Sequence, residues 1–67
     1  MRKTLTQRVL NVASRRGVFN RRVAKESFKL YGIYMNEYLH NSVMRTARTL
    51  TEQGLLRRTG PGEYRPN

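Results

Sequence analysis

The sequence has neither cysteine nor aspartate, and it has a single histidine, His40. Without cysteine the chain offers no disulfide framework and no thiolate zinc site, so we expect its stability to come from packing alone. No apolar stretch is long enough for a membrane span or for the core of a signal peptide. These absences favour an intracellular, cytoplasmic protein in a reducing compartment.

The same absences leave little with which to build a catalytic site. A hydrolase or transferase needs a nucleophile with its base, paired carboxylates or metal ligands. His40 has no productive nucleophilic partner, since Ser42 does not face it on a helix, and a structural role is the better interpretation. The glycines around Pro61 do not match a phosphate loop, which runs from a strand into a helix. We therefore predict no enzyme, no cofactor and no metal.

Positive charge is what the sequence has in excess. Lysine and arginine number 14 against 4 glutamates, and the formal net charge is +10 over 67 residues. Such a field attracts polyanions, and counterion release from a nucleic-acid backbone is the usual source of affinity. Solubility alone would need far less charge. We expect a nucleic-acid-binding protein that folds as one domain, residues 1–67, without a membrane partner.

Apolar periodicity predicts two helices in the first half of the chain. Residues 4–16 place Leu5, Val9, Val12 and Ala13 on one side, begin at a cap that is either Thr4 or Thr6, and end at Gly17. Val18 and Phe19 are then expected to be extended, as a short third strand. Asn20 is a good N-cap for a second helix over residues 21–31. The packing side of this helix is predicted to comprise Val23, Ala24, Ser27, Phe28 and Tyr31.

The last third of the chain has the most informative pattern. A helix over residues 36–53 buries Val43, Ala47 and Leu50 on one face. Its cap is Asn36 or, if the preceding turn is longer, His40 or Asn41. Gly54 suits the left-handed position that ends a helix. A hairpin over residues 55–65 then turns at Gly60-Pro61-Gly62, and Tyr64 is expected to join the core. Only the basic start, residues 1–3, and the end, residues 65–67, are predicted to be loose.

This basic helix, followed by Gly54-Leu55-Leu56-Arg57 and a hairpin with Tyr64, resembles the recognition helix and wing of the winged helix-turn-helix superfamily. The resemblance implies a mainly α fold, with three helices and a wing of two or three strands. The segment between Gly32 and Val43 is longer than the superfamily's usual tight turn. It holds either an early start of the third helix or an inserted loop or helical turn.

Double-stranded DNA is the partner that this resemblance implies. A helix fits the major groove of B-form DNA, and side chains near its amino end reach the base edges. We expect base contacts from Asn41, Ser42 and Arg45, and phosphate contacts from Arg48 and Thr49, one turn later. The alternative for Asn41 and Ser42 is a helix cap, and for Arg45 a solvated surface position.

Two further groups are expected to contact the DNA backbone. Arg57, Arg58 and Arg65 lie on or beside the hairpin, but strand alternation puts Arg57 and Arg58 on opposite faces. Only one of these two should therefore act together with Arg65. At the start of the second helix the dipole favours a phosphate, and the expected contacts there are Arg21, Arg22 and Lys25.

Other functions remain open at this stage. The leading hypothesis is a small transcriptional regulator or DNA-architecture factor of prokaryotic or phage type, nucleoid-associated if prokaryotic. RNA or ribosome binding would depend more on exposed tyrosines. A protein-interaction module would use an apolar patch around Ile33, Tyr34 and Tyr38. Tyr31, Tyr34 and Tyr38 either complete the core or lie exposed, where two of them could form a homodimer contact.

Overall fold

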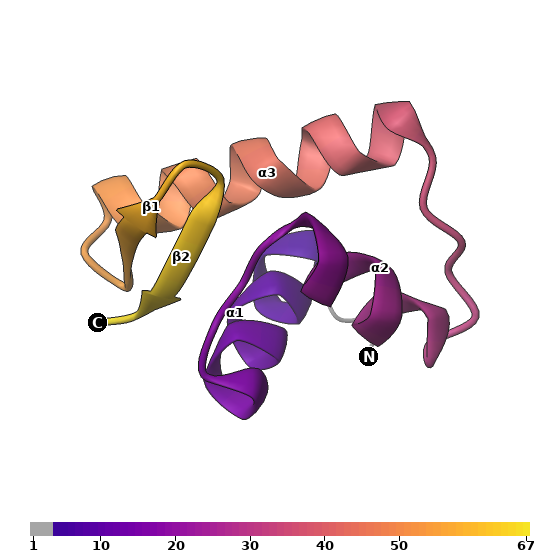
Figure 1. Cartoon of the computed structure of the whole chain (residues 1–67), viewed down its shortest axis with the longest axis horizontal. Coiled ribbons are helices and arrows are strands. Elements are labelled where there is room, and N and C mark those ends of the chain that lie inside the picture. Colours follow the sequence, from indigo (N-terminus) through magenta and orange to yellow (C-terminus); the bar gives the residue numbers. More distant parts are fainter. Residues whose placement is uncertain (1–3) are drawn as a thin grey trace.

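Three helices are followed by a two-stranded antiparallel hairpin, so the fold is mainly α. The computed structural model describes residues 4–67; the prediction of a loose start concerns residues 1–3, which lie outside this range. The helices and strands are α1 (Leu5–Arg16), α2 (Arg21–Lys29), α3 (Glu37–Glu52), β1 (Leu56–Gly60) and β2 (Glu63–Pro66). In Figure 1, the hairpin lies beside the carboxyl end of α3, and a long connection from α2 leads to the amino end of α3. This topology is compatible with a winged helix.

Side-chain caps define where each helix begins. Thr4 and Gln7 form a reciprocal capping box at α1. At α2 and α3 the amide oxygens of Asn20 and Asn36 accept the backbone N–H of the residue three positions on, each at 2.8 Å. The Asn36 cap shows that α3 begins early, so residues 37–42 of the long segment belong to the helix and residues 33–36 form a short irregular connection. The predicted Asn20 cap is confirmed, and the structure selects Thr4 for α1 and Asn36 for α3 among the caps that the sequence left open.

The second helix is shorter than predicted. It ends at Lys29, because Tyr31 and Gly32 donate their N–H groups to the carbonyls of Phe28 and Lys29, three residues back. These bonds tighten the chain into a turn that Gly32 completes at a φ of +75°. Tyr31 therefore leaves the packing side and is 40% exposed, with its ring edge against Phe28 at 6.3 Å between centroids.

Besides packing on α1 and α3, the hairpin pairs through its backbone with one residue of the connection between α1 and α2. β1 and β2 pair antiparallel, and Phe19 and Tyr64 exchange two backbone hydrogen bonds of 2.6 and 2.8 Å. The predicted third strand is thus a single-residue bridge. The prediction of a loose carboxyl end is wrong, since Arg65 and Pro66 belong to β2 and the Asn67 amide donates to the Gly54 carbonyl at 2.8 Å.

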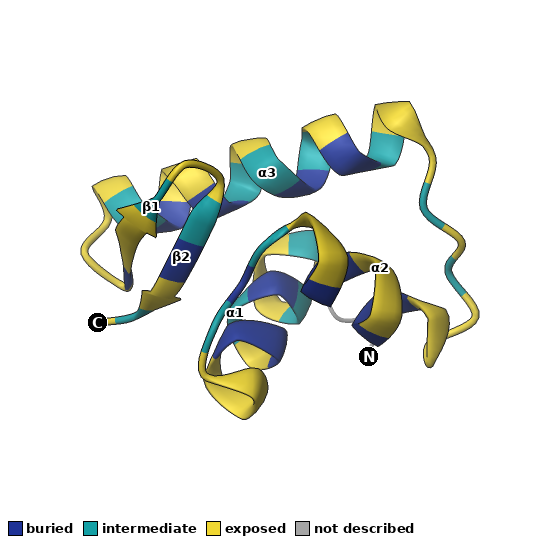
Figure 2. Cartoon of the chain, viewed as in Figure 1, coloured by how far each residue is buried: buried dark blue, intermediate teal, exposed yellow. Residues whose placement is uncertain are grey.

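A single core holds all five elements together, and it includes every apolar residue predicted for it apart from Tyr31 and the half-buried Leu5. Figure 2 shows the buried side of α3 facing α1 and the hairpin, with the exposed side turned away. Tyr64, predicted to join the core, is buried. The core residues are Val9, Val12, Ala13, Phe19, Val23, Ala24, Phe28, Val43, Ala47, Leu50, Leu56 and Tyr64.

None of the helices within residues 4–67 combines the length and the apolar character that crossing a bilayer requires.

Candidate nucleic-acid interface

The exposed side of α3 carries a continuous polar stripe. Because Val43, Ala47 and Leu50 are buried against the domain, the opposite side of the helix faces solvent along its whole length. The second-turn position of Asn41 shows that it is not the helix cap, a role that Asn36 fills. The exposed residues on this stripe are Tyr38, Asn41, Arg45, Arg48, Thr49 and Glu52.

A groove of about 580 Å³ separates this stripe from the hairpin. It is open to solvent, and its walls come from α3 on one side and from both strands on the other. Three of the predicted cations converge here, Arg45 and Arg48 from the helix and Arg58 from β1. The full lining is Asn41, Met44, Arg45, Arg48, Thr51, Glu52, Arg58 and Tyr64.

Strand register decides which arginines of the hairpin can act with α3. Arg58 lies opposite Tyr64, and both line the groove. Arg57 lies opposite Arg65, and cross-strand partners share a face, so these two occupy the other face of the hairpin. The predicted separation of Arg57 from Arg58 is confirmed, and Arg57 is the one that accompanies Arg65.

The arginines of the hairpin also differ in how firmly they are held. Arg58 donates from Nε to the Gly60 carbonyl at 3.2 Å, which fixes its stem while its terminal nitrogens remain available. On the other face Arg65 Nε lies 3.8 Å from Glu63 Oε1, and the Thr59 hydroxyl donates to the same oxygen at 2.8 Å. Glu63 therefore weakens the positive potential beside Arg65.

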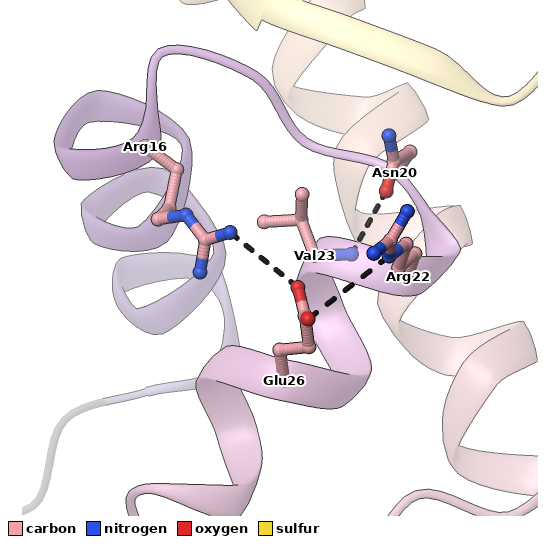
Figure 3. Close-up of polar contacts among 5 residues, drawn as sticks. All are labelled: Arg16, Asn20, Arg22, Val23 and Glu26. Atoms are coloured by element: carbon pink, nitrogen blue, oxygen red, sulfur yellow. Dashed lines mark hydrogen bonds and ion pairs between the residues drawn. The ribbon is translucent and has the colours of Figure 1, made fainter.

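The start of α2 forms a separate basic cluster that does not line the groove. Arg21 reaches across to α3 and pairs with Glu37 at 2.6 Å. Arg22 shares Glu26 with Arg16 of α1, at 4.0 and 3.4 Å (Figure 3). Lys25 makes no ion pair with any residue from 4 to 67. Lys25 therefore offers the least encumbered charge of this cluster, and Arg21 instead ties α2 to α3.

The two hydroxyl residues predicted to contact DNA lie on the far edge of the stripe. Neither Ser42 nor Thr49 lines the groove. The Thr49 hydroxyl donates to the Arg45 carbonyl at 3.1 Å, a bond that occupies the proton a phosphate would need. Ser42 is half-buried, and its carbonyl accepts the hydroxyl of Thr46 at 2.9 Å.

His40 occupies the junction between α2 and α3. It is buried, and its Nδ1 has no hydrogen-bond partner among the atoms of residues 4–67. Burial lowers the pKa of His40 below 6.5, Arg21 and Lys25 lower it further, and Glu37 acts in the opposite direction. The neutral form is therefore favoured, as expected of a structural histidine.

Sequence reasoning missed three residues of the groove, Met44, Thr51 and Tyr64, and gave no role to a fourth, Glu52, although helical spacing puts Glu52 on the exposed face. A helical projection could have found Met44 and Thr51, which flank the exposed stripe on one side. The position of Tyr64 depends on the pairing of β2 with Phe19, a contact between distant segments that periodicity does not reveal.

In the part of the chain that the structure describes, no three residues among histidine, cysteine, aspartate and glutamate come together as a metal site would require.

The chain matches no protein-family model, and no similarity to a curated protein or to a solved structure was found. The geometry of the chain itself therefore has to support any functional assignment.

Proposed function

We propose that this chain is a winged-helix protein that binds double-stranded DNA through α3 and the hairpin. The observation that carries the proposal is the groove in which Arg45, Arg48 and Arg58 converge with Asn41, because these cations come from two elements and face one concave surface. A net charge of +10 supplies the long-range attraction for the phosphate backbone.

In this proposal the exposed stripe of α3 enters the major groove. Asn41 and Arg45 lie nearer the amino end of the helix, where side chains reach base edges, with arginine suited to guanine and asparagine to adenine. Arg48 and Arg58, which line the groove between α3 and the hairpin, face the phosphates beside the contacted bases. Such phosphate contacts fix register and affinity, and base contacts supply the sequence preference.

The remaining predicted residues contribute at the margins of the interface. Arg57 and Arg65, on the other face of the hairpin, contact the backbone or the minor groove beside the wing. In α2, Lys25 contacts a phosphate, whereas Arg21 and Arg22 pair with Glu37 and Glu26 and add to the positive potential there. Ser42 and Thr49 border the stripe. The corresponding biological role is a small transcriptional regulator or a DNA-architecture factor acting in the cytoplasm.

A second candidate function, RNA binding, is favoured by two exposed tyrosines. Tyr34 and Tyr38 are 75% and 81% exposed, and aromatic rings stack on unpaired bases. A protein-interaction module built on the same region has less apolar surface than predicted, because Ile33 is half-buried and packs against the core.

Titration of the protein into fluorescent duplex DNA, single-stranded DNA and structured RNA, each at two salt concentrations, separates these functions. Preference for the duplex with a steep loss of affinity at higher salt supports the proposal. Preference for RNA that Tyr34→Ala abolishes would replace it with the second candidate, and no binding to any of the three would refute both.

A duplex site selected from random sequences then tests the assignment of α3. We expect Arg45→Ala to weaken binding to this site by about 1 to 3 kcal/mol and to relax sequence preference. Arg58→Ala should weaken selected and random duplexes alike, because it removes a phosphate contact. Arg15→Ala, which removes the same charge from α1, is the matched control and should leave sequence preference unchanged. Equal losses on both duplexes for Arg45→Ala would contradict a recognition role for α3.

A further inference from the structure

A second concave surface lies between α1 and α2 and shares no residue with the α3 groove. It is a small notch of about 80 Å³, lined by Val12, Arg15 and Arg16 of α1 and by Ser27, Leu30 and Tyr31 at the end of α2. This volume corresponds to roughly two to three water molecules, which is the scale of one aliphatic side chain. The notch can therefore accept a single apolar group.

The notch has an apolar side that the fold leaves uncovered. Leu30 is 82% exposed and follows directly after α2, where the chain turns away toward Gly32. Tyr31 is 40% exposed beside it, and its ring is fixed by Phe28 on one edge. Because the turn fixes both residues, covering them would cost a partner little ordering of this chain.

Arginines surround this apolar side. The Arg8 guanidinium carbon lies 5.2 Å from the centre of the Tyr31 ring. Arg16 lies 3.4 Å from Glu26, an exposed pair that a competing carboxylate can replace (Figure 3). Arg15 forms no ion pair with any residue that the structure describes. An apolar centre with a cationic rim is complementary to an apolar side chain flanked by carboxylates.

Charge argues against a second copy of this chain as the occupant. The chain has no aspartate, and Glu26, Glu37 and Glu63 already pair with arginines, which leaves Glu52 alone among its glutamates within residues 4–67. Two copies would bring arginines against arginines. A nucleic acid would match the cations but would make no use of the exposed leucine, since phosphates are contacted by charged and polar groups.

We propose that the notch between α1 and α2 binds an acidic segment of a partner protein. One apolar side chain of that segment packs against Val12 and Leu30, and its carboxylates pair with Arg15 and Arg16. This surface is independent of the α3 groove, so the same domain can hold a polyanion on one face and a protein segment on another.

The test is selection from a pool of short peptides randomised over aspartate, glutamate, serine, leucine and phenylalanine, with the immobilised full chain as bait. The strongest binder is then titrated against the parent and against variants by fluorescence anisotropy. We expect enriched peptides to combine carboxylates with one large apolar residue. Leu30→Ala and Arg15→Ala should each weaken that peptide about tenfold, the loss expected for one buried leucine or one desolvated charge pair.

Matched controls distinguish the notch from general charge attraction. Leu55→Ala and Arg57→Ala remove an exposed leucine and an exposed arginine from the hairpin region, and both should leave peptide affinity unchanged. All four variants alter exposed positions, so circular dichroism should show a parent-like fold for each. Enrichment of acidic peptides without an apolar residue, equal losses in Arg57→Ala, or no enrichment would overturn the proposal. The proposal would also be overturned if no peptide depended on Leu30 and Arg15 while binding of a single-stranded oligonucleotide did.

Discussion

The two ends of α3 differ in how the fold holds them. At the carboxyl end Leu50, Leu56 and Tyr64 are buried together. Gly54 turns the chain into the hairpin, and the side-chain amide of Asn67, just after the hairpin, donates to the Gly54 carbonyl. At the amino end an exposed ion pair between Arg21 and Glu37 joins α3 to α2.

The amino end of α3 also has a buried polar atom without a hydrogen-bond partner among the described residues, and exposed aromatic rings beside it. His40 is buried with an unpartnered nitrogen, and Tyr34 and Tyr38 stand exposed on either side of the Asn36 cap. The same helix is therefore stabilised by apolar burial at its carboxyl end and by an exposed polar contact at its amino end. In the proposed complex with DNA, this more loosely packed end is the one whose side chains reach the bases.

Of the variants that test the difference between the two ends of α3, Leu50→Ala is expected to change stability the most. The side chain is fully buried between α3 and the rest of the core, so its truncation should lower the free energy of unfolding by about 2 to 5 kcal/mol. Leu55→Ala, at a leucine that is 47% exposed, is the control and should cost far less. Urea denaturation compares the two, and a parent-like Leu50→Ala would mean that the buried face of α3 is assigned wrongly.

A smaller effect is expected where α3 turns into the hairpin. Gly54 has a φ of +81°, and an added Cβ would meet open space, so Gly54→Ala should be destabilised by backbone strain alone, by about 1 to 2 kcal/mol. Gly60→Ala is the control, because Gly60 lacks a positive φ and an added Cβ would approach the Glu63 Cβ only to 3.9 Å. Equal melting temperatures for the two variants would show that the turn after α3 contributes no constraint.

The smallest effect should come from the amino end, as a dependence of stability on pH. Because the folded-state pKa of His40 is lowered below 6.5, the unfolded chain binds a proton more readily. At a pH well above 6.5 His40 is neutral in both the folded and the unfolded chain, so its titration does not change the free energy of unfolding there. Stability should then fall as the pH falls through 6.5 toward the folded-state value. Chemical denaturation across this range measures the slope.

His40→Leu provides the control for that slope. Leucine keeps apolar volume at the junction and removes the titrating group, while Arg21, Lys25 and Glu37 remain. The variant should lose the fall in stability near pH 6.5. A fall of the same size in His40→Leu would assign the pH dependence to other groups.

Local patterns predicted most of the fold correctly because each depends on near neighbours. The caps at Thr4, Asn20 and Asn36 and the left-handed glycines require only the residues beside them. The prediction that the second helix reaches residue 31 is wrong. Tyr31 fits the apolar spacing of a helix, but its backbone N–H bonds to the Phe28 carbonyl in a turn, and apolar spacing carries no information about that turn. The carboxyl end was misjudged because Asn67 bonds to Gly54, far away in sequence.

The candidate site was predictable in its helix and much less so in its hairpin. Periodicity alone selected Asn41, Arg45 and Arg48 as solvent-facing, since burial of one helix face exposes the other. It could not rank Arg57 against Arg58, because alternation separates the two without saying which face meets α3. The bridge between Phe19 and Tyr64 joins the hairpin to the core, and Arg58, opposite Tyr64, lines the groove with α3.

Residue type and local spacing are enough to specify the charge of the protein, its three amphipathic helices, their caps and the turn of the hairpin. The convergence of three arginines in one groove, the pairing of Arg21 with Glu37 and the exposure of Leu30 over a notch arise only when the elements pack together. These features depend on distances between elements, and such distances are set when the whole core packs at once.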